Sequence, residues 1–211
     1  MKIKDAFVKR RSAMNFREDF EMNELDFNMI FELARFSPSI FNTQATRYLV
    51  IADKQKQAKL KDLSGRQHKL VTASGVILVL GDKEFLDDAN VKQIYTPMLN
   101  LKMMSEEEYN TMTKIISQYR QSLDTASLTN QLYTNVFINV GILLSIISIL
   151  GFDSCPMNAQ NTEEVKALFD IPDRYELLFL LPVGKSTEDQ RLRGYRHPVS
   201  ELVKFNKFSY I

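Results

Sequence analysis

Two basic clusters, one near each end of the sequence, could hold an anion. Arg10, Arg11 and Ser12 are consecutive, and the segment 193–198 (Arg-Gly-Tyr-Arg-His-Pro) supplies two further guanidinium groups. Guanidinium groups bind phosphate oxygens through charge-assisted and often paired hydrogen bonds. Considered separately, the first cluster is better explained as the solvated basic end of a helix, and the second as a solvated loop. An anion site requires the fold to bring them together.

A third polar segment lies at 37–44 and reads Ser-Pro-Ser-Ile-Phe-Asn-Thr-Gln. Pro38 disfavours helical geometry at Ser37, so the segment predicts a turn that ends the preceding helix. Its hydroxyl and carboxamide groups could meet a flat heterocycle. A plain helix-to-strand connection explains the same residues.

Composition and charge exclude several classes of function. The chain has 211 residues, a net charge of +1 and a single cysteine, Cys155. Near neutrality provides no basic field for nucleic acid, and His68 and His197 are too few and too scattered for a zinc enzyme, so we expect no metal. One cysteine allows no internal disulfide, which suits a reducing compartment. The first residues lack the apolar core of a signal peptide, and we therefore expect a cytoplasmic protein.

The element around which the others must be arranged is the uncharged stretch from Leu128 to Gly151. Its length predicts a helix, because strands rarely run so long. A helix that is apolar nearly all round is either buried or crosses a membrane. Asn135 and Ser148 interrupt the apolar run, and no Lys or Arg flanks it closely. We therefore predict a core helix, with a sheet on one side and helices or a second subunit on the other, and Gly151 as its C-terminal cap.

The other elements predict an α+β fold, because the strong strands are few and widely separated in the sequence. Strands are expected at 48–52, 75–80 and 175–184, and further helices at 3–11, 24–36, 53–63, 105–123 and 161–169. The residues expected to cap these helices are Asn23, Asp53, Ser105 with Glu108, and Asn161 with Glu164.

Three remaining features carry weaker expectations. Leu25 is expected on the inner face of the 24–36 helix with Ile30, Phe31 and Ala34. Segment 81–104 predicts a mobile loop with short helical pieces. Pro182 suggests that the last strand lies at a sheet edge or is close to its end. The aromatic tail after 198 either folds back or adds to a partner's sheet edge.

Taken in order, these motifs resemble the nitroreductase family of flavin-dependent oxidoreductases. Segment 9–16 (Lys-Arg-Arg-Ser-Ala-Met-Asn-Phe) is similar to the family's opening R-R-S-x-R-x-F element, and segment 37–51 to its A/S-P-S-x-x-N-x-Q-P-W signature. Segment 150–157 is similar to the end of its long apolar helix, and segments 171–184 and 196–203 to its closing strand and R-x-P element. Each motif is loose, but together they cover nearly the whole chain.

The resemblance implies one domain over 1–211, with a central, mostly antiparallel sheet flanked by helices. It also implies an FMN-binding homodimer with its flavins at the interface, a C-terminal segment that extends onto the partner subunit, and a lid at about 85–124. Under this resemblance, Arg10, Arg11, Ser12 and Arg196 would hold the FMN phosphate and ribityl chain. Two arginines from opposite ends of the chain must then converge at a seam between two copies.

The resemblance also assigns residues to the flavin ring. Pro38, Ser39 and Asn42 would reach the flavin from the other subunit. On the near side, the ring would be lined by three consecutive residues, with a backbone N–H after the proline close to flavin N5: Pro156, Met157 and Asn158.

The chain departs from the family pattern at several positions. Met14 stands where the family usually has a cation near flavin N1 and O2, and Lys69 is expected to supply the missing charge, although an ordinary exposed lysine is the alternative. Segment 158–161 differs from the family's loop, and Ala45 and Thr46 replace its Pro-Trp. Cys155 beside the flavin loop is better explained as a small core residue, and both histidines as loop residues.

The resemblance therefore implies an enzyme that passes a hydride from NADH or NADPH through flavin N5 to a small acceptor, such as a nitro compound or quinone. The flavin carries the chemistry, so no catalytic side chain is assigned. Two alternatives stay open: a flavin-binding protein with another role, which Met14 and segment 158–161 favour, and a non-enzymatic helical interaction module.

Overall fold

The computed structural model describes residues 3–187 and 192–208. Its centre is an antiparallel sheet in the order β1-β2-β5-β3, with β4 also paired to β5. The strands are β1 (Thr46–Ile51), β2 (Gly75–Asp82), β3 (Asp153–Ser154), β4 (Met157–Asn158) and β5 (Tyr175–Gly184). The α+β class and the antiparallel sheet expected from the sequence are confirmed.

Pro182 does not mark a sheet edge, because β5 lies inside the sheet with β2 on one side and the short β3 and β4 on the other. The Pro182 carbonyl accepts a hydrogen bond from Cys155 N at 3.2 Å, on the side where the neighbouring strand changes from β3 to β4. The N–H that proline lacks would point to that same irregular side, where a missing donor is tolerated. The alternative of a nearby strand end is correct, since β5 ends at Gly184.

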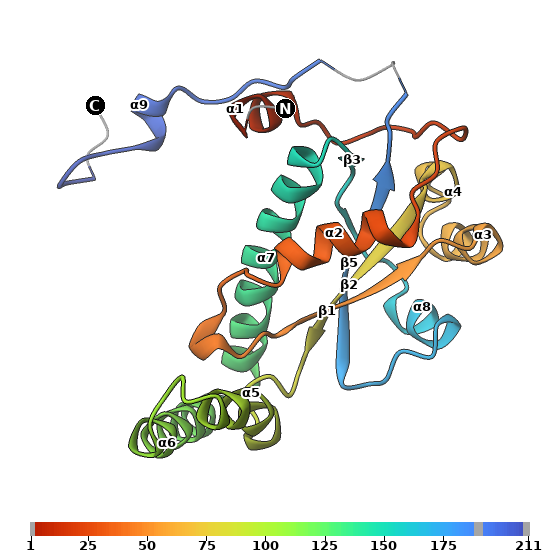
Figure 1. The fold of residues 1–211 in the computed structure, drawn as a ribbon. Helices are drawn as coiled ribbons and strands as arrows, with labels where there is room; N and C mark the ends of the chain where they lie inside the picture. Colours follow the sequence, from red (N-terminus) through yellow and green to blue (C-terminus); the bar gives the residue numbers. More distant parts are fainter. Residues whose placement is uncertain (1–2, 188–191, 209–211) are drawn as a thin grey trace.

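Helix α7 (Thr125–Ile149) crosses one face of the sheet and is flanked there by α2 (Glu24–Ala34) (Figure 1). It is long and apolar enough, by length and composition alone, to cross a membrane. Here it packs on β1, β2 and β3 and on helices α1 (Ile3–Lys9) and α2, as predicted for a core helix. Gly151 follows the helix with φ +85, a left-handed conformation that glycine adopts without strain, so the expected cap is confirmed.

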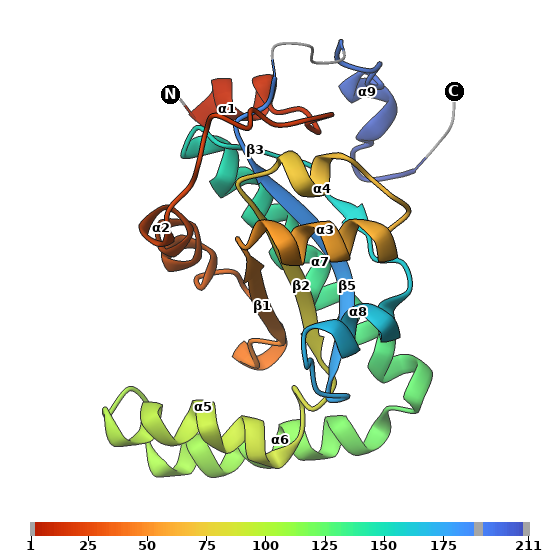
Figure 2. The same ribbon diagram turned by 90° about the vertical axis from the view of Figure 1, so that its right-hand side faces the viewer.

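The opposite face of the sheet is covered by α3 (Lys54–Leu63), α4 (Lys69–Thr72) and α8 (Thr162–Leu168) (Figure 2). Alternate residues of β2 divide between the two faces, as the period of two of a strand requires. Ile77 and Val79 join the core under α2 and α7, whereas Val76 and Leu78 join the core under α3 and α8. Every residue of β2 is buried, so this strand is the middle of the protein.

Segment 81–104 is not a loop with short helical pieces. It contains α5 (Asp88–Asn100), which pairs with α6 (Glu106–Ser122) as a helical hairpin at one end of the sheet (Figure 2). Val91, Tyr95 and Ile116 anchor the hairpin in the main core. The sequence pattern was obscured by Pro97, which lies inside α5.

Local capping signals were largely correct. Asn23 and Ser105 both form the reciprocal capping box, and Asp53 accepts from Lys56 N at 2.8 Å. Asn161 is the exception: it has φ +47 and makes no cap, and its side chain instead donates to Leu63 O at 2.8 Å. Leu25 was also misplaced, being 72% exposed, and Phe27 takes its place on the inner face of α2.

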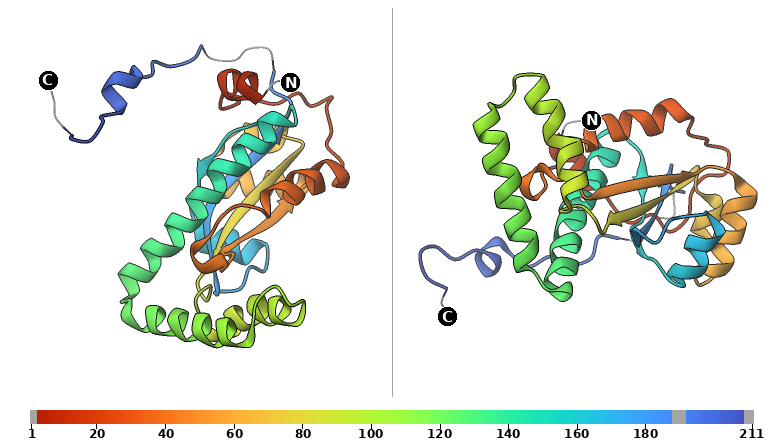
Figure 3. Two further views of the ribbon diagram at one scale, coloured as in Figure 1. Left: turned by 60° about the vertical axis from the view of Figure 1, so that its left-hand side comes forward. Right: turned by 90° about the horizontal axis from the view of Figure 1, so that it is seen from below.

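The three remaining elements are α1 (Ile3–Lys9), the 3-10 turn η1 (Ile40–Asn42) and α9 (Val199–Leu202). Helix α1 packs on the C-terminal end of α7, and η1 lies towards its other end (Figure 1). The segment that carries α9 runs away from the sheet and helices rather than folding back (Figure 3). Its apolar side chains are exposed in this single chain, among them Leu202, Phe205 and Phe208.

Candidate cofactor site

The loop after α1 is held against the end of the sheet beside β3. Ser12 forms an isolated parallel bridge with Ser154, and Ala13 N donates to Ser154 O at 3.1 Å. Further along, Phe16 N donates to Thr72 Oγ1 at 3.2 Å. The first sequence motif is thereby placed next to the segment that leads into Pro156, although Ser12 and Ser154 are 142 positions apart in the chain.

Three arginines from the two ends of the chain gather at the C-terminal end of α1. Arg11 Nη1 donates to Val8 O at 2.9 Å, and Arg193 Nη2 donates to Val8 O and, at 3.3 Å, to Arg10 O. These carbonyls are the unpaired acceptors at the end of the helix. Desolvation, followed by the charges of Arg11 and Arg196, lowers the pKa of the Arg193 guanidinium. The three charges therefore act on one another.

No acidic side chain neutralises this cluster within residues 3–187 and 192–208. Neither Arg11, Arg193 nor Arg196 forms an ion pair there, and Arg196 Nη1 donates only to the nearby carbonyls of Gly194 and Tyr195. Like charges held together without a counter-ion are a donor set suited to an anion such as phosphate. Arg10 lies next to the cluster and lines a pocket of about 180 Å³ between α1 and α7.

Lys69 also reaches this end of the sheet. Its Nζ lies 3.4 Å from Cys155 Sγ, and Cys155 directly precedes Pro156. Lys69 is only partly exposed, and Cys155 is buried, at 6% exposure. The alternative of an ordinary, fully exposed lysine does not describe this position. Met14 stays at the surface, with 39% of its area exposed.

The backbone of β4 presents one N–H away from the sheet. Cys155 N and Ala159 N both donate to β5, to Pro182 O at 3.2 Å and Leu178 O at 3.3 Å. Since N–H groups alternate sides along a strand, Met157 directs its N–H towards β5 and Asn158 directs its N–H outwards. The Met157 side chain packs on the core under α3 and α8, so this residue offers little to a ligand.

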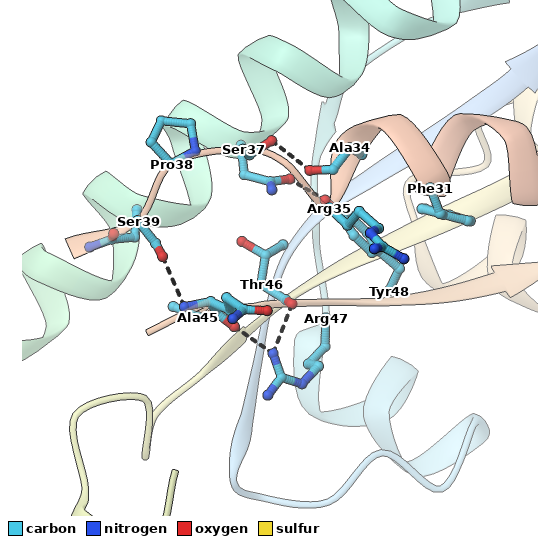
Figure 4. A pocket seen from close by; sticks show the side chains of 13 residues that line it. Phe31, Ala34, Arg35, Ser37, Pro38, Ser39, Ala45, Thr46, Arg47 and Tyr48 are labelled. Atoms are coloured by element: carbon cyan, nitrogen blue, oxygen red, sulfur yellow. Dashed lines mark hydrogen bonds between the residues drawn. The ribbon is translucent and has the colours of Figure 1, made fainter. Parts of the chain in front are cut away.

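The polar turn at 37–44 forms a second group of candidate residues. Pro38 and Ser39 line a pocket of about 210 Å³ between α2, β1 and α7 (Figure 4). Ser39 Oγ accepts from Gln44 N at 2.9 Å. Phe41, Asn42 and Gln44 adopt left-handed φ values of 48, 54 and 51. Such strain in non-glycine residues concentrates at functional sites, and here three instances fall within four residues.

Within one chain the two groups of candidate residues lie apart along α7. Asn135 Oδ1 accepts from Ile40 N at 2.7 Å, which fixes the polar turn to the first half of the helix. Ser148 Oγ donates to Ala6 O at 3.0 Å, which fixes α1 to its last turn. Thirteen residues of helix separate these contacts, or about 20 Å at ~1.5 Å per residue. Within one subunit the two groups are therefore attached to different ends of α7.

Comparison with known proteins identifies the family of this chain. A family model described as Nitroreductase family matches residues 7–185. The chain belongs to the nitroreductase family. Among its nitroreductase relatives is a Bacillus subtilis (strain 168) protein named "Putative NAD(P)H nitroreductase MhqN", 33% identical over 198 residues that cover 93% of this chain and 95% of the relative.

Solved nitroreductase structures share the fold. The crystal structure of B. subtilis ydfN, described as a "putative nitroreductase", superposes with a TM-score of 0.90 at 31% identity and covers 97% of this chain and 98% of its own. A protein from Exiguobacterium sibiricum 255-15, described as a putative nitroreductase in complex with FMN, has a TM-score of 0.89 at 23% identity, with 98% of each chain covered. At that identity the second comparison speaks for the fold alone.

Sequence reasoning placed Ser12, Lys69 and Pro156 in segments that the structure brings together, but it assigned no role to Arg193. Its basic cluster was recognised, yet the contacts of Arg193 with the α1 carbonyls depend on a partner about 185 residues away in the chain. Arg47 was missed for a similar reason. No pattern in the neighbouring sequence marks either arginine, because the carbonyls that hold them can belong to any residue type.

Proposed function

We propose that this nitroreductase family member is an FMN-dependent oxidoreductase that passes a hydride from NADH or NADPH to a small acceptor such as a nitro compound or quinone. One observation carries the proposal. Arg11, Arg193 and Arg196 come together without an acidic partner among the described residues, next to the loop in which Ser12 meets Ser154.

The residues present fit the FMN phosphate. A phosphate near charge −2 is best held by more than one cation, and this end of the sheet supplies three guanidinium groups. Arg11, Ser12 and Arg196 would bind the phosphate and the start of the ribityl chain, with Arg10 at the rim of the cluster. Arg193 would hold the C-terminal segment against α1.

At the flavin ring, the chain would contribute a backbone N–H group and one positive charge. The outward N–H of Asn158 is the free donor of β4 and would approach flavin N5, with Pro156 and Met157 behind it. Lys69 would supply the cation near N1 and O2 that Met14 cannot. A positive charge there stabilises the anionic reduced ring and raises its reduction potential.

A homodimer would complete the site. The turn that carries Pro38, Ser39 and Asn42 is attached to α7 at Asn135, about 20 Å along the helix from the attachment of α1 at Ser148, so these residues would face the flavin of the second subunit. Exposed apolar surface supports such a partner: α7 leaves Phe137 and Ile138 uncovered at 49% and 45% exposure.

Two more uncovered surfaces support the dimer. An exposed stripe of apolar residues runs along α2 and just past its end, comprising Leu25, Met29 and Leu33 of the helix and Phe36 after it. The C-terminal segment carries its own exposed apolar side chains away from the sheet (Figure 3). Apolar surface of this extent is typical of an interface, and a second copy's C-terminal segment could cover the α2 stripe.

When bound, FMN supplies a carrier that accepts a hydride and passes it on. The protein's own contribution is to bind, orient and tune it, which requires no catalytic side chain. Reductant and acceptor would use the same space in turn, a ping-pong cycle. The α5–α6 hairpin, within the 85–124 segment, would form the lid over that space. We also propose a cytoplasmic location, which the packing of α7 against the sheet supports.

An absorbance spectrum of the purified protein tests the proposal most directly. Flavin bands, followed by NADH or NADPH oxidation that depends on a nitroaromatic or quinone acceptor, are expected. Flavin bands without any such turnover would favour a flavin-binding role of another kind. A colourless protein that stays colourless after incubation with FMN would favour a non-enzymatic interaction module and contradict the proposal.

A further inference from the structure

A second pocket lies next to the polar turn, between the start of β1 and helix α5. Its volume is about 370 Å³, and its wall contains the carboxamides of Asn42, Gln44, Asn90 and Gln93 together with Arg47. Asn90 is a structural member, because its Nδ2 donates to the carbonyls of Thr43 and Phe85 at 3.1 and 2.8 Å. The side chains of Asn42, Gln44 and Gln93 form no hydrogen bond within the described residues, so their donors face the pocket unused.

Arg47 is the one charged member of the wall, and its position is fixed by backbone. Its Nη1 donates to Gln44 O at 2.5 Å and to Thr46 O at 3.1 Å. Figure 4 shows the guanidinium folded back along the strand and directed away from Ser37 and Pro38. Two donors on one nitrogen are thus used, and the Nε donor forms no hydrogen bond within the described residues, whereas Nη2 faces Asp82 Oδ2 at 3.4 Å.

The only acidic partner of Arg47 among the described residues is already committed elsewhere. Asp82 receives two hydrogen bonds from Arg174, both at 2.7 Å, whereas its Oδ2 lies 3.4 Å from Arg47 Nη2. Arg174 also pairs with Glu84 at 3.1 Å. The two arginines are thus matched by two carboxylates, but the contact of Arg47 is the longest of the group, and 37% of its side chain is exposed, so its guanidinium can still meet an anion in the pocket.

We propose that Arg47 and the carboxamides beside it bind the anionic group of a reactant. That group is either the carboxylate of an acidic nitroaromatic or quinone acceptor, or a phosphate of the nicotinamide dinucleotide. Guanidinium is the side chain best matched to both oxyanions, and the unused amide donors complete their hydrogen bonds. Apolar contact comes from Ile94 and Met98 of α5, which line the same pocket.

This inference rests on the proposed function, because Asn42 would place the pocket beside the flavin of the second subunit. It goes further by assigning a charge preference to the reactants. A neutral acceptor would form no ion pair with Arg47, whereas an anionic acceptor would form a charge-assisted hydrogen bond with it.

The test compares Arg47→Gln with the unmodified dimer on matched pairs of reactants. The acceptors are nitrobenzene and 4-nitrobenzoate, and the reductants are NADH and NADPH. If the acceptor's carboxylate is bound, kcat/KM for 4-nitrobenzoate falls roughly ten- to a hundredfold while that for nitrobenzene changes little. If a phosphate of the dinucleotide is bound, Arg47→Gln raises KM for the reductant. The rise is expected either for NADH and NADPH alike or for NADPH alone.

Two control variants separate recognition from support of the fold. Arg47→Lys keeps the charge and should recover part of the loss. Arg174→Gln leaves Asp82 to pair with Arg47 alone without touching the pocket wall, so it should lower kcat/KM for the anionic acceptor more than for the neutral one. An equal change with all four reactants in Arg47→Gln would overturn the proposal.

A binding measurement makes the inference independent of turnover. Titration of the purified dimer with benzoate, followed by calorimetry, should show binding that Arg47→Gln weakens. Inorganic phosphate serves as the second probe. A flavin-loaded, active protein whose affinity for both probes is unchanged by Arg47→Gln, and whose reactant preferences are unchanged, would overturn this inference and leave the proposed function standing. A protein that takes up no FMN but binds benzoate through Arg47 would contradict the proposed function and still support an anion site at Arg47.

Discussion

The ammonium nitrogen of Lys69 lies 3.4 Å from the sulfur of Cys155, the residue that precedes Pro156. This contact joins the start of α4 to the loop beside β4, and it directs a cation to the end of the sheet where Ser12 meets Ser154. It turns the sequence-based hypothesis about Lys69 into a specific geometry.

Lys69→Met is expected to lower the flavin reduction potential. Removing one positive charge near the reduced ring costs roughly 1–2 kcal/mol at a partly screened site, or about 20–40 mV for a two-electron couple. Equilibrium titration against a reference dye measures it. Lys69→Arg should keep most of the potential, and an unchanged potential in Lys69→Met would show that Lys69 is not the compensating cation.

Arg196→Gln is expected to weaken FMN binding but not riboflavin binding, because riboflavin lacks the phosphate. Losing one charge-assisted contact should raise the Kd for FMN roughly ten- to a hundredfold. Quenching of flavin fluorescence on titration measures both ligands. Arg35→Gln, which removes an exposed arginine paired with Glu32, serves as the control. Equal losses for FMN and riboflavin would place the phosphate elsewhere.

Gly141→Leu is expected to separate the subunits. A Cβ at this position meets no atom within 4 Å in the single chain, so one subunit can accommodate the larger side chain. A partner packed against this face of α7 could not. Sedimentation measures the dissociation, and loss of FMN should follow it. Gly141→Ala is the matched control and should gain up to about 1 kcal/mol of stability. A Gly141→Leu variant that stays dimeric would show that this face lies outside the interface.

Asp82→Ala is expected to cost roughly 3 kcal/mol or more in the free energy of unfolding. Asp82 is fully buried, and its removal leaves Arg174 and Arg47 without their shared carboxylate. Glu84→Gln removes an exposed partner of Arg174 and should cost less than about 1 kcal/mol. Urea denaturation compares them, and similar losses for the two variants would contradict the assignment.

We expect the folded protein to lose stability at high pH because of the buried phenol of Tyr48. Burial raises the pKa of its phenol well above the usual value of 10.0, and its O–H donates to Asn139 Oδ1. In the unfolded chain the phenol ionises near pH 10, whereas in the folded chain it stays protonated. Its contribution is therefore complete below pH 10 and is lost as the pH rises above that value. Tyr48→Phe should show a smaller fall in urea midpoint between about pH 9 and 11, and equal falls would refute the assignment to Tyr48.

The parts of the fold that follow from neighbouring residues were predictable. Asn23 and Ser105 cap their helices through bonds to residues two or three positions away, so their signals are local. Asn161 fails as a cap because its side chain bonds to Leu63, 98 residues earlier. Strands β3 and β4 have two residues each and exist only through pairing with β5, so no pattern in their own sequence predicts them.

The candidate site was also predictable from the sequence only in part. Motif order indicated that segments 10–12 and 156–158 and Lys69 are functional, and the structure brings Ser12, Lys69 and the segment that leads into Pro156 together at one end of the sheet. The roles of Arg193 and Arg47 come from contacts with backbone carbonyls, which any residue type can provide. Such acceptors leave no trace in the sequence, so only the folded chain identifies these arginines.

Helix α7 also limits how the chain can vary in length. It holds the polar turn at Asn135 and α1 at Ser148 on one continuous helix. Inserting a single residue between these positions would turn one attachment about 100° around the axis relative to the other. The loops at the protein surface can gain or lose residues without this consequence, so natural and engineered insertions should be absent from this stretch while they accumulate elsewhere.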